Sequence, residues 1–276
     1  MLTPAQRHFQ TVMAQRHGKS SGGDVERTAY EQQLHRLRMD KSRLSQVQSD
    51  ATKAELKRAL LPDYQGWING VLAADSGQAD DVLTTIMIWS IDAGLISDAL
   101  RIAGYVLRHR LPMPDHYKRT VATALVDEIC DPALAAFKAD TSRAPLPAAL
   151  LLQLEQLTAG EDMPDQVRAK LYKTLGYALR LDNNELSAAR DWLQRAVTLF
   201  DGIGVKRDIE LLGRALKKST ESEAGAENTD APPAPPAPPA DKPDDKPAAK
   251  ATRAPRKSTA AKASRTTTPR ARKSAS

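Results

Sequence analysis

Cysteine, aromatic residues and long apolar runs are all scarce in this sequence of 276 residues. Cys130 is the sole cysteine, which excludes an intramolecular disulfide and an all-cysteine metal site and indicates a reducing compartment. No apolar run reaches the roughly 18 to 20 residues that a membrane span requires, and no apolar signal region opens the chain. We therefore expect a protein that is neither exported nor inserted in a membrane.

The C-terminal segment lacks every large apolar residue. Residues 219–276 contain no Leu, Ile, Val, Met or aromatic residue, so they bury too little surface to offset the entropy of ordering, and we predict disorder. Ala231–Ala240 reads APPAPPAPPA, which is typical of a semi-rigid polyproline spacer of ~30 Å. Beyond it, Lys250–Ser276 holds nine Lys or Arg residues and no acid. This composition is typical of an arm that binds nucleic acid.

Two basic regions are candidates for contact with DNA. In the tail we expect contacts with phosphates of any sequence, and the candidates are Lys250, Arg253, Arg256, Lys257, Lys262, Arg265, Arg270, Arg272 and Lys273. The second region is a short N-terminal helix that we expect Thr3 to cap, with Pro4 in its first turn. Its candidates are Arg7, His8, Arg16 and Lys19. The alternative for this second set is that the charges simply solvate a helix face.

The rest of the chain shows helical periodicity and no alternating stretch of useful length, so we predict an all-α fold. Residues 1–23 form a basic helix and linker, and residues 62–218 form an all-helical core domain. Its densest apolar stretch, Asp80–Pro114, predicts a helical hairpin that turns at Gly94. The spacing of apolar and small residues from Tyr172 to Ala196 approximates a tetratricopeptide helix pair, which predicts a bundle with solenoid-like packing.

Residues 24–61 contain neither Gly nor Pro, and we predict one long helix there. Its apolar residues recur at nearly heptad spacing. The helix either lies on the core domain or forms a coiled-coil seam through which copies of the chain associate. The seam candidates are Tyr30, Leu34, Leu37, Leu44 and Val47.

No catalytic motif is complete. Gly18, Lys19 and Ser20 end like a phosphate-binding loop, but Met13 replaces the first glycine, so we do not expect ATP hydrolysis. A two-metal nuclease needs carboxylates that converge on ions ~3.5 to 4 Å apart. The candidate catalytic residues of that kind are Asp127, Glu128 and Asp131, although Asp131 precedes Pro132 and serves equally well as a helix cap. We expect neither a metal site nor a cofactor in this chain.

Several stretches together resemble the small terminase subunit of cos-packaging temperate tailed phages of the peduovirus type. They are TPAQRH at Thr3–His8, LPDYQGWINGVL at Leu61–Leu72, DDVLTTIMIWSIDAGL at Asp80–Leu95 and ALRIAGYVLRHRLPMP at Ala99–Pro114. The resemblance covers residues 1–218 and implies binding to the cos site of concatemeric DNA. It also implies self-association in the cytoplasm of an infected bacterium. The implied partner is a large ATPase subunit that uses ATP and Mg²⁺, cuts the DNA into cohesive-ended genomes and packages them into procapsids.

Such subunits are customarily called terminase endonuclease subunits, yet the resemblance transfers no catalytic residue to this sequence. We therefore expect recognition and positioning of DNA, with cleavage by the holoenzyme. A rival reading from the residues alone is a helical-repeat adaptor that binds peptides and has a nonspecific nucleic-acid-binding tail. A third reading is a nuclease in its own right. Sequence-specific retention of cos DNA at moderate salt separates the first reading from the adaptor.

Overall fold

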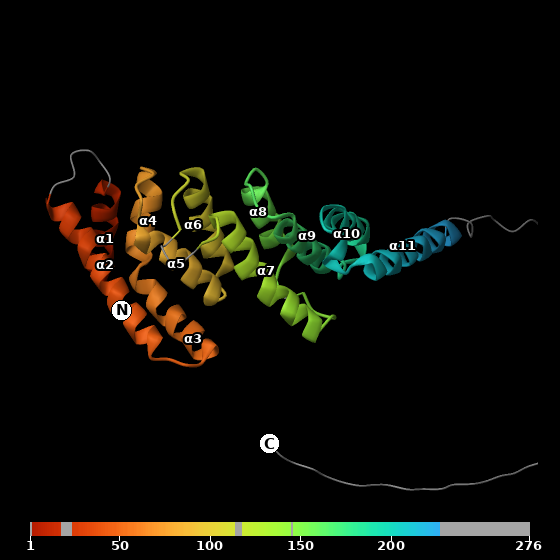
Figure 1. Ribbon diagram of the computed structural model, residues 1–276, viewed down its shortest axis with the longest axis horizontal. Coiled ribbons are helices and arrows are strands. Elements are labelled where there is room, and N and C mark those ends of the chain that lie inside the picture. Colours follow the sequence, from red (N-terminus) through yellow and green to blue (C-terminus); the bar gives the residue numbers. More distant parts are fainter. Residues whose placement is uncertain (1, 18–23, 114–117, 145, 227–276) are drawn as a thin grey trace, which may run out of the picture. The chain divides into compact units, whose positions relative to one another are not determined.

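The computed structural model describes residues 2–17, 24–113, 118–144 and 146–226, and every regular element in these ranges is a helix (Figure 1). The all-α prediction is confirmed. Within the same ranges no helix is long and apolar enough to cross a membrane. The tail candidates for DNA binding and Lys19 lie outside the described residues.

The helices of the N-terminal part differ from the prediction in one respect. Helix α1 (Pro4–Arg16) begins as expected, because Thr3 Oγ1 accepts a hydrogen bond from the Gln6 amide at 3.3 Å. The continuous helix predicted over residues 24–61 is wrong: the chain forms α2 (Asp24–Ser45) and then α3 (Asp50–Leu60). Ser49 caps α3 by accepting from the Thr52 amide at 3.3 Å, so a local side-chain hydrogen bond ends the helical run where no Gly or Pro does.

The remaining elements follow in order along the chain. They are η1 (Leu61–Asp63), α4 (Gln65–Ala74), α5 (Asp81–Asp92), α6 (Ile96–Arg108), α7 (Val121–Ala139), α8 (Ala148–Thr158), α9 (Asp165–Leu179), η2 (Asn183–Glu185), α10 (Leu186–Leu199), η3 (Asp201–Ile203) and α11 (Lys206–Ala226).

The predicted central hairpin is confirmed as α5 and α6. The Asp80 carboxylate caps α5 by accepting from the amides of Val82 at 2.8 Å and Leu83 at 2.9 Å. At the turn Gly94 has a φ of +76°, a conformation that costs glycine little and other residues more. Helix α5 is buried on all sides from Val82 to Ile91, and α6 buries one face, which includes Ala99, Leu100 and Val106.

Helix α7 runs through Pro132, where we expected a break and a new start. That expectation is wrong, and with it the role of Asp131 as a cap, because Asp131 lies inside the helix. A proline in a helix costs a backbone hydrogen bond. The flanking residues Ile129, Cys130 and Ala133 are all buried, so tertiary packing offsets that cost.

One hydrophobic core extends from Met13 in α1 to Ala178 in α9. Helix α1 is part of it, because it packs on α4 at two glycines, Gly66 and Gly70. A Cβ atom at Gly70 would lie 2.6 Å from Cβ of Ala14, so only glycine permits this approach. Residues 1–23, 24–61 and 62–218 thus all contribute side chains to a common core.

The stretch that suggested a tetratricopeptide pair forms α9 and α10, which pack closely (Figure 1). Gly176 permits their approach, since a Cβ atom there would lie 2.5 Å from Cδ2 of Leu193. The rings of Tyr172 and Trp192 add a contact with their centroids 5.1 Å apart. Solenoid-like packing of the whole domain stays a prediction.

Candidate nucleic-acid interface

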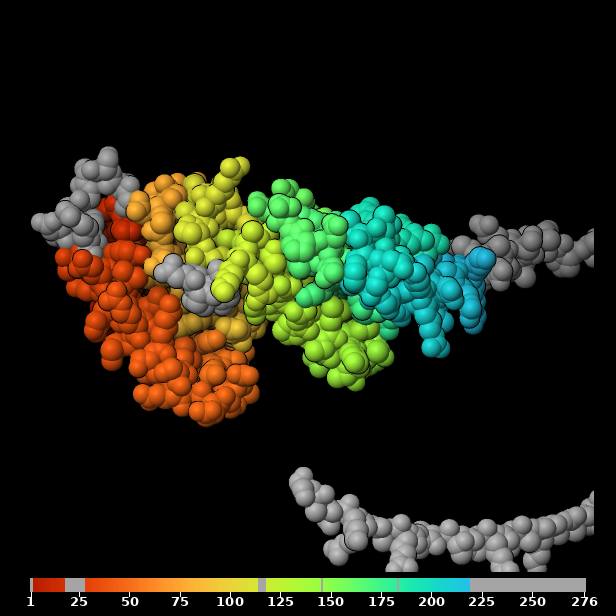
Figure 2. Space-filling view, viewed as in Figure 1, coloured from red at the N-terminus to blue at the C-terminus, as the bar shows by residue number. Residues whose placement is uncertain are grey.

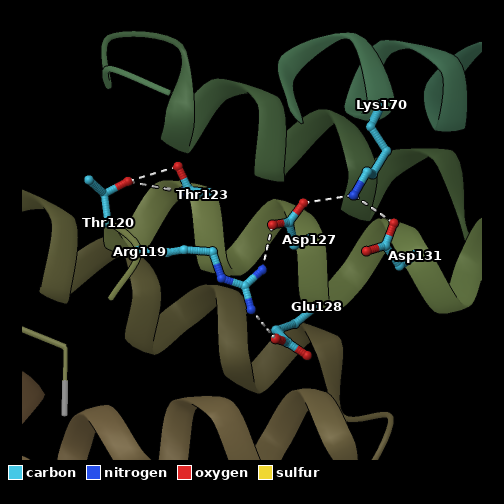
Figure 3. A network of polar contacts seen from close by, with 7 residues as sticks. All are labelled: Arg119, Thr120, Thr123, Asp127, Glu128, Asp131 and Lys170. Carbon is cyan, nitrogen blue, oxygen red and sulfur yellow. Dashed lines mark hydrogen bonds and ion pairs between the residues drawn. The ribbon is translucent and has the colours of Figure 1, made fainter. Parts of the chain in front are cut away.

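The candidate catalytic carboxylates of α7 face cations (Figure 3). Arg119 directs one guanidinium nitrogen to Asp127 at 2.5 Å and the other to Glu128 at 3.3 Å. From α9, Nζ of Lys170 lies 2.7 Å from Asp127 Oδ1 and 2.7 Å from Asp131 Oδ1. A pair of metal ions would have to displace both cations from this network.

The protonation of Lys170 supports the same conclusion. Burial alone would lower the pKa of this ammonium group, but the hydrogen bonds to Asp127 and Asp131 outweigh burial and raise the pKa above its ordinary value. The group therefore stays charged at neutral pH. No set of three or more His, Cys, Asp or Glu side chains among the described residues is placed to hold a metal ion. The network thus acts as a clamp between α7 and α9.

Cys130, which lies next to this network in sequence, is also unsuited to nucleophilic chemistry. Its thiol is fully buried, and burial raises the pKa of the thiol to about 12. Only the thiolate is a nucleophile, so the group is inert at neutral pH.

The basic candidates of α1 lie on an ordered helix, and Arg7, His8 and Arg16 are all exposed. Arg7 also borders a hollow of about 400 Å³ together with Arg58 of α3 and Arg101 of α6. We call this hollow the arginine groove. Its floor is largely apolar, and it is lined further by Leu61, Pro62, Gln65, Ile68, Ile86, Ser90, Leu95, Asp98 and Ile102.

Arg58 and Arg101 do not stand out in the sequence. Each is one charged residue among several on an amphipathic helix, and nothing in the local spacing distinguishes it. Only the packing of α1, α3 and α6 around α4 and α5 brings these residues to the same groove as Arg7.

A second hollow, of about 610 Å³, lies between α3 and α7, and in Figure 2 it opens between the orange and the green parts of the surface. Its two lysines are paired with acids. Lys53 lies 3.4 Å from Asp50, and Lys57 lies 2.5 Å from Asp92. Arg58 borders this hollow as well, but the acids Asp50, Asp92 and Glu128 balance its three cations, so the hollow carries no excess of positive charge.

The proposed coiled-coil seam is used within the chain. Leu37 and Leu44 are 3% and 7% exposed, and Leu34 packs on the same core. The Tyr30 hydroxyl accepts a hydrogen bond from the Asp81 amide at 3.2 Å. Val47 is half-buried. These contacts hold α2 against its own domain, and self-association through the seam stays a prediction.

Behind α1 a buried polar cluster joins the helices. Nε1 of Trp67 donates to Oδ2 of Asp80 at 2.8 Å. The ring of His17, at the end of α1, lies 4.5 Å from that of Tyr30 and 5.6 Å from that of Trp67, measured between centroids. Burial lowers the pKa of His17, and the nearby Asp80 carboxylate opposes this shift. His17 is thus neutral at pH 7. Its ring packs against those of Tyr30 and Trp67 at the C-terminal end of α1.

Comparison with known proteins gives two matches. Residues 34–166 match a family model described as phage small terminase subunit. The chain is 40% identical over 227 residues to the protein of Escherichia phage P2 that is named "Terminase, endonuclease subunit". The match covers 82% of this chain and 90% of that protein. No solved structure matches the chain.

Proposed function

Since the chain belongs to the phage small terminase subunit family, we propose that it is the DNA-recognition subunit of a viral DNA-packaging terminase. It binds the cos site of concatemeric DNA in the cytoplasm of the infected host. A large ATPase subunit, which uses ATP and Mg²⁺, then acts with it to produce cohesive-ended genomes and to fill procapsids. The observation that carries the proposal is 40% identity across 82% of the chain, because a match of that extent reaches far beyond a single motif.

Cleavage belongs to the holoenzyme in this proposal. The phage P2 relative is named an endonuclease subunit. In this chain, however, the carboxylates of α7 are engaged by Arg119 and Lys170. The subunit contributes by holding the DNA in place, which alone can raise the rate of a cut made by a bound partner.

DNA contacts come from two regions with different physical roles. Arg7, His8 and Arg16 project from an ordered helix, so they keep a fixed position relative to the duplex. Self-association would present several copies of this helix to a repeated site. The nine cations of Lys250–Ser276 contact phosphates of any sequence and add affinity without specificity.

A mobility-shift assay with the full chain tests the proposal. The probes are a duplex that contains the cos site and a scrambled duplex of the same length and composition. We expect the cos duplex to be retained at a salt concentration that releases the scrambled one. Equal retention of both would instead favour the adaptor with a nonspecific tail.

A further inference from the structure

The cations of the described residues fall into two groups. Many face a carboxylate: examples are Arg43 with Asp40, Arg108 with Asp75, Arg180 with Asp208 and Lys206 with Asp201. The three arginines of the groove belong to the other group. Neither Arg7, Arg58 nor Arg101 forms an ion pair with any residue in the described part of the chain. Their charge is available to an outside anion.

Two of these arginines are held in position by neutral acceptors. Nε of Arg58 donates to the Ala93 carbonyl at 3.2 Å, and its Nη2 donates to the same oxygen. Nη1 of Arg101 donates to Oδ1 of Asn69 at 3.0 Å. A neutral acceptor orients the guanidinium group and leaves its charge uncancelled, with further N–H donors free for a ligand.

One acid, Asp98, also borders the groove. It lies in the first turn of α6, where the partial positive charge of the helix N-terminus stabilises a carboxylate. With three arginines and this one acid in its lining, the groove has a net positive charge.

We propose that the arginine groove binds the sugar–phosphate backbone of duplex DNA, with phosphate oxygens on Arg7, Arg58 and Arg101. This inference rests on the proposed function and names residues for it. Arginine forks match phosphate oxygens in pairs. The apolar floor at Ile68 and Ile102 offers contact to a deoxyribose.

Continuity with α1 favours DNA over an acidic peptide as the occupant. Arg7 borders the groove and precedes His8 on the exposed first half of α1, so a backbone that crosses the groove passes the start of α1. Contacts of this type carry no sequence information themselves but fix the register of the protein on the duplex. The groove thereby fixes the position on the duplex of α1, to which we assign recognition of the cos site.

The test uses fluorescence anisotropy of the full chain with cos and scrambled duplexes over a range of salt concentrations. Arg58→Ala and Arg101→Ala should each weaken the binding of both duplexes by roughly tenfold, since each removes a charge-assisted contact. The double variant should flatten the slope of log affinity against log salt by about 2, at about 0.9 per phosphate contact. Arg58→Lys and Arg101→Lys, which keep the charge and lose the fork, should fall between wild type and alanine.

Arg108→Ala is the matched control, because it removes an exposed arginine from the same helix as Arg101 but one that already faces Asp75. It should leave the affinity and the salt slope unchanged. Thermal melts by circular dichroism confirm that each variant is folded. Arg101→Ala keeps the test valid if Arg58→Ala destabilises the turn at Ala93.

The outcomes separate this inference from the proposed function. Wild-type affinity and slope in the arginine variants would overturn the groove and leave cos recognition standing. Loss of cos preference in the wild type would overturn the proposed function, while parallel weakening of both duplexes would still support the groove. Competition by millimolar inorganic phosphate beyond that of chloride at equal ionic strength would assign the site to free phosphate. Unchanged DNA binding with loss of the large subunit from a pull-down would assign it to an acidic protein surface, which also contradicts the proposal.

Discussion

Nζ of Lys170 on α9 lies 2.7 Å from Oδ1 of Asp127 on α7. This contact engages a carboxylate that a metal-dependent nuclease would need as a ligand. The carboxylate cluster that the sequence suggested as catalytic thus contributes an ion pair between two helices.

Asp127→Ala should therefore lower stability. The substitution leaves Arg119 with Glu128 and Lys170 with Asp131, so the free energy of unfolding should fall by about 1–3 kcal/mol as these hydrogen bonds to charged groups are lost. Urea melts measure the change. Glu161→Ala, at an exposed residue, is the control and should stay within about 0.5 kcal/mol of wild type. Mg²⁺-dependent nicking by the purified wild-type chain that Asp127→Ala abolishes would show that the cluster is catalytic after all.

Gly70→Ala should be among the more destabilising single-methyl changes in the chain. The added Cβ would lie 2.6 Å from that of Ala14, so α1 has to move away from α4 at a cost of about 1–3 kcal/mol. Gly213→Ala in α11 makes a matched control, since nothing lies within 4 Å of its Cβ position. That change should stabilise the helix by about 0.5–1 kcal/mol. Equal effects in the two variants, measured by thermal or urea melts, would contradict the close packing of α1 on α4.

Leu37→Ala should lower the free energy of unfolding by about 2–5 kcal/mol, because this leucine is 3% exposed in the core of the single chain. Met39→Ala on the same helix should cost less than about 0.5 kcal/mol, since Met39 is 55% exposed. Urea melts and light scattering on both variants distinguish packing of α2 within the chain from self-association through α2. A folded Leu37→Ala protein of unchanged stability and reduced mass would show that the seam serves self-association instead.

The contribution of His17 to stability should be lost on mild acidification. Its folded pKa lies below the unfolded value of about 6.5, so below that pH the unfolded chain takes up a proton that the folded chain does not. The contribution is fully present above about pH 6.5 and is lost as the pH falls towards the lowered pKa. His17→Phe keeps the ring contacts with Tyr30 and Trp67 and should reduce this loss.

The comparison of wild type with His17→Phe is needed because burial raises the pKa of the neighbouring Asp80, which titrates with the opposite sign. That carboxyl is present in both proteins, so the difference between their stabilities from pH 8 to pH 5 reports the imidazole together with its coupling to Asp80. A difference that does not change over this range would refute the assignment.

Removal of residues 227–276 should weaken the binding of cos and scrambled duplexes alike. It should also flatten the slope of log affinity against log salt by several units, since it deletes all nine cations of the arm. His8→Ala with Arg16→Ala should instead reduce the preference for cos. Deletion of the whole first helix is unsuitable for this purpose, because Met13 and Ala14 are buried in the core. Loss of the cos preference on removal of the tail alone would reverse the two roles.

The sequence predicted the parts of the fold that local chemistry determines. Thr3, Asp80 and Gly94 mark helix ends through capping and backbone freedom, and the structure has them there. It missed one local cap, at Ser49, and one effect of tertiary packing, at Pro132. Ser49 ends a run that propensity alone would continue, and buried neighbours carry α7 through Pro132.

The same limit applies to the site. Arg7 stood out because it lies in a basic cluster, but Arg58 and Arg101 join it only through the folding of three helices around a common core. The pairing of Asp127 with Lys170 was equally hidden, since its two residues come from different helices.

The central question is whether the folded chain distinguishes cos DNA from other DNA. The measurement is a competition titration in which unlabelled cos or scrambled duplex displaces a labelled cos duplex from the full-length chain at two salt concentrations. We predict that the cos duplex competes at least about tenfold better, and that this ratio persists at the higher salt while both affinities fall, because phosphate contacts carry the salt dependence and not the specificity. Equal competition by the two duplexes at both salt concentrations would contradict the assignment of this chain as the DNA-recognition subunit.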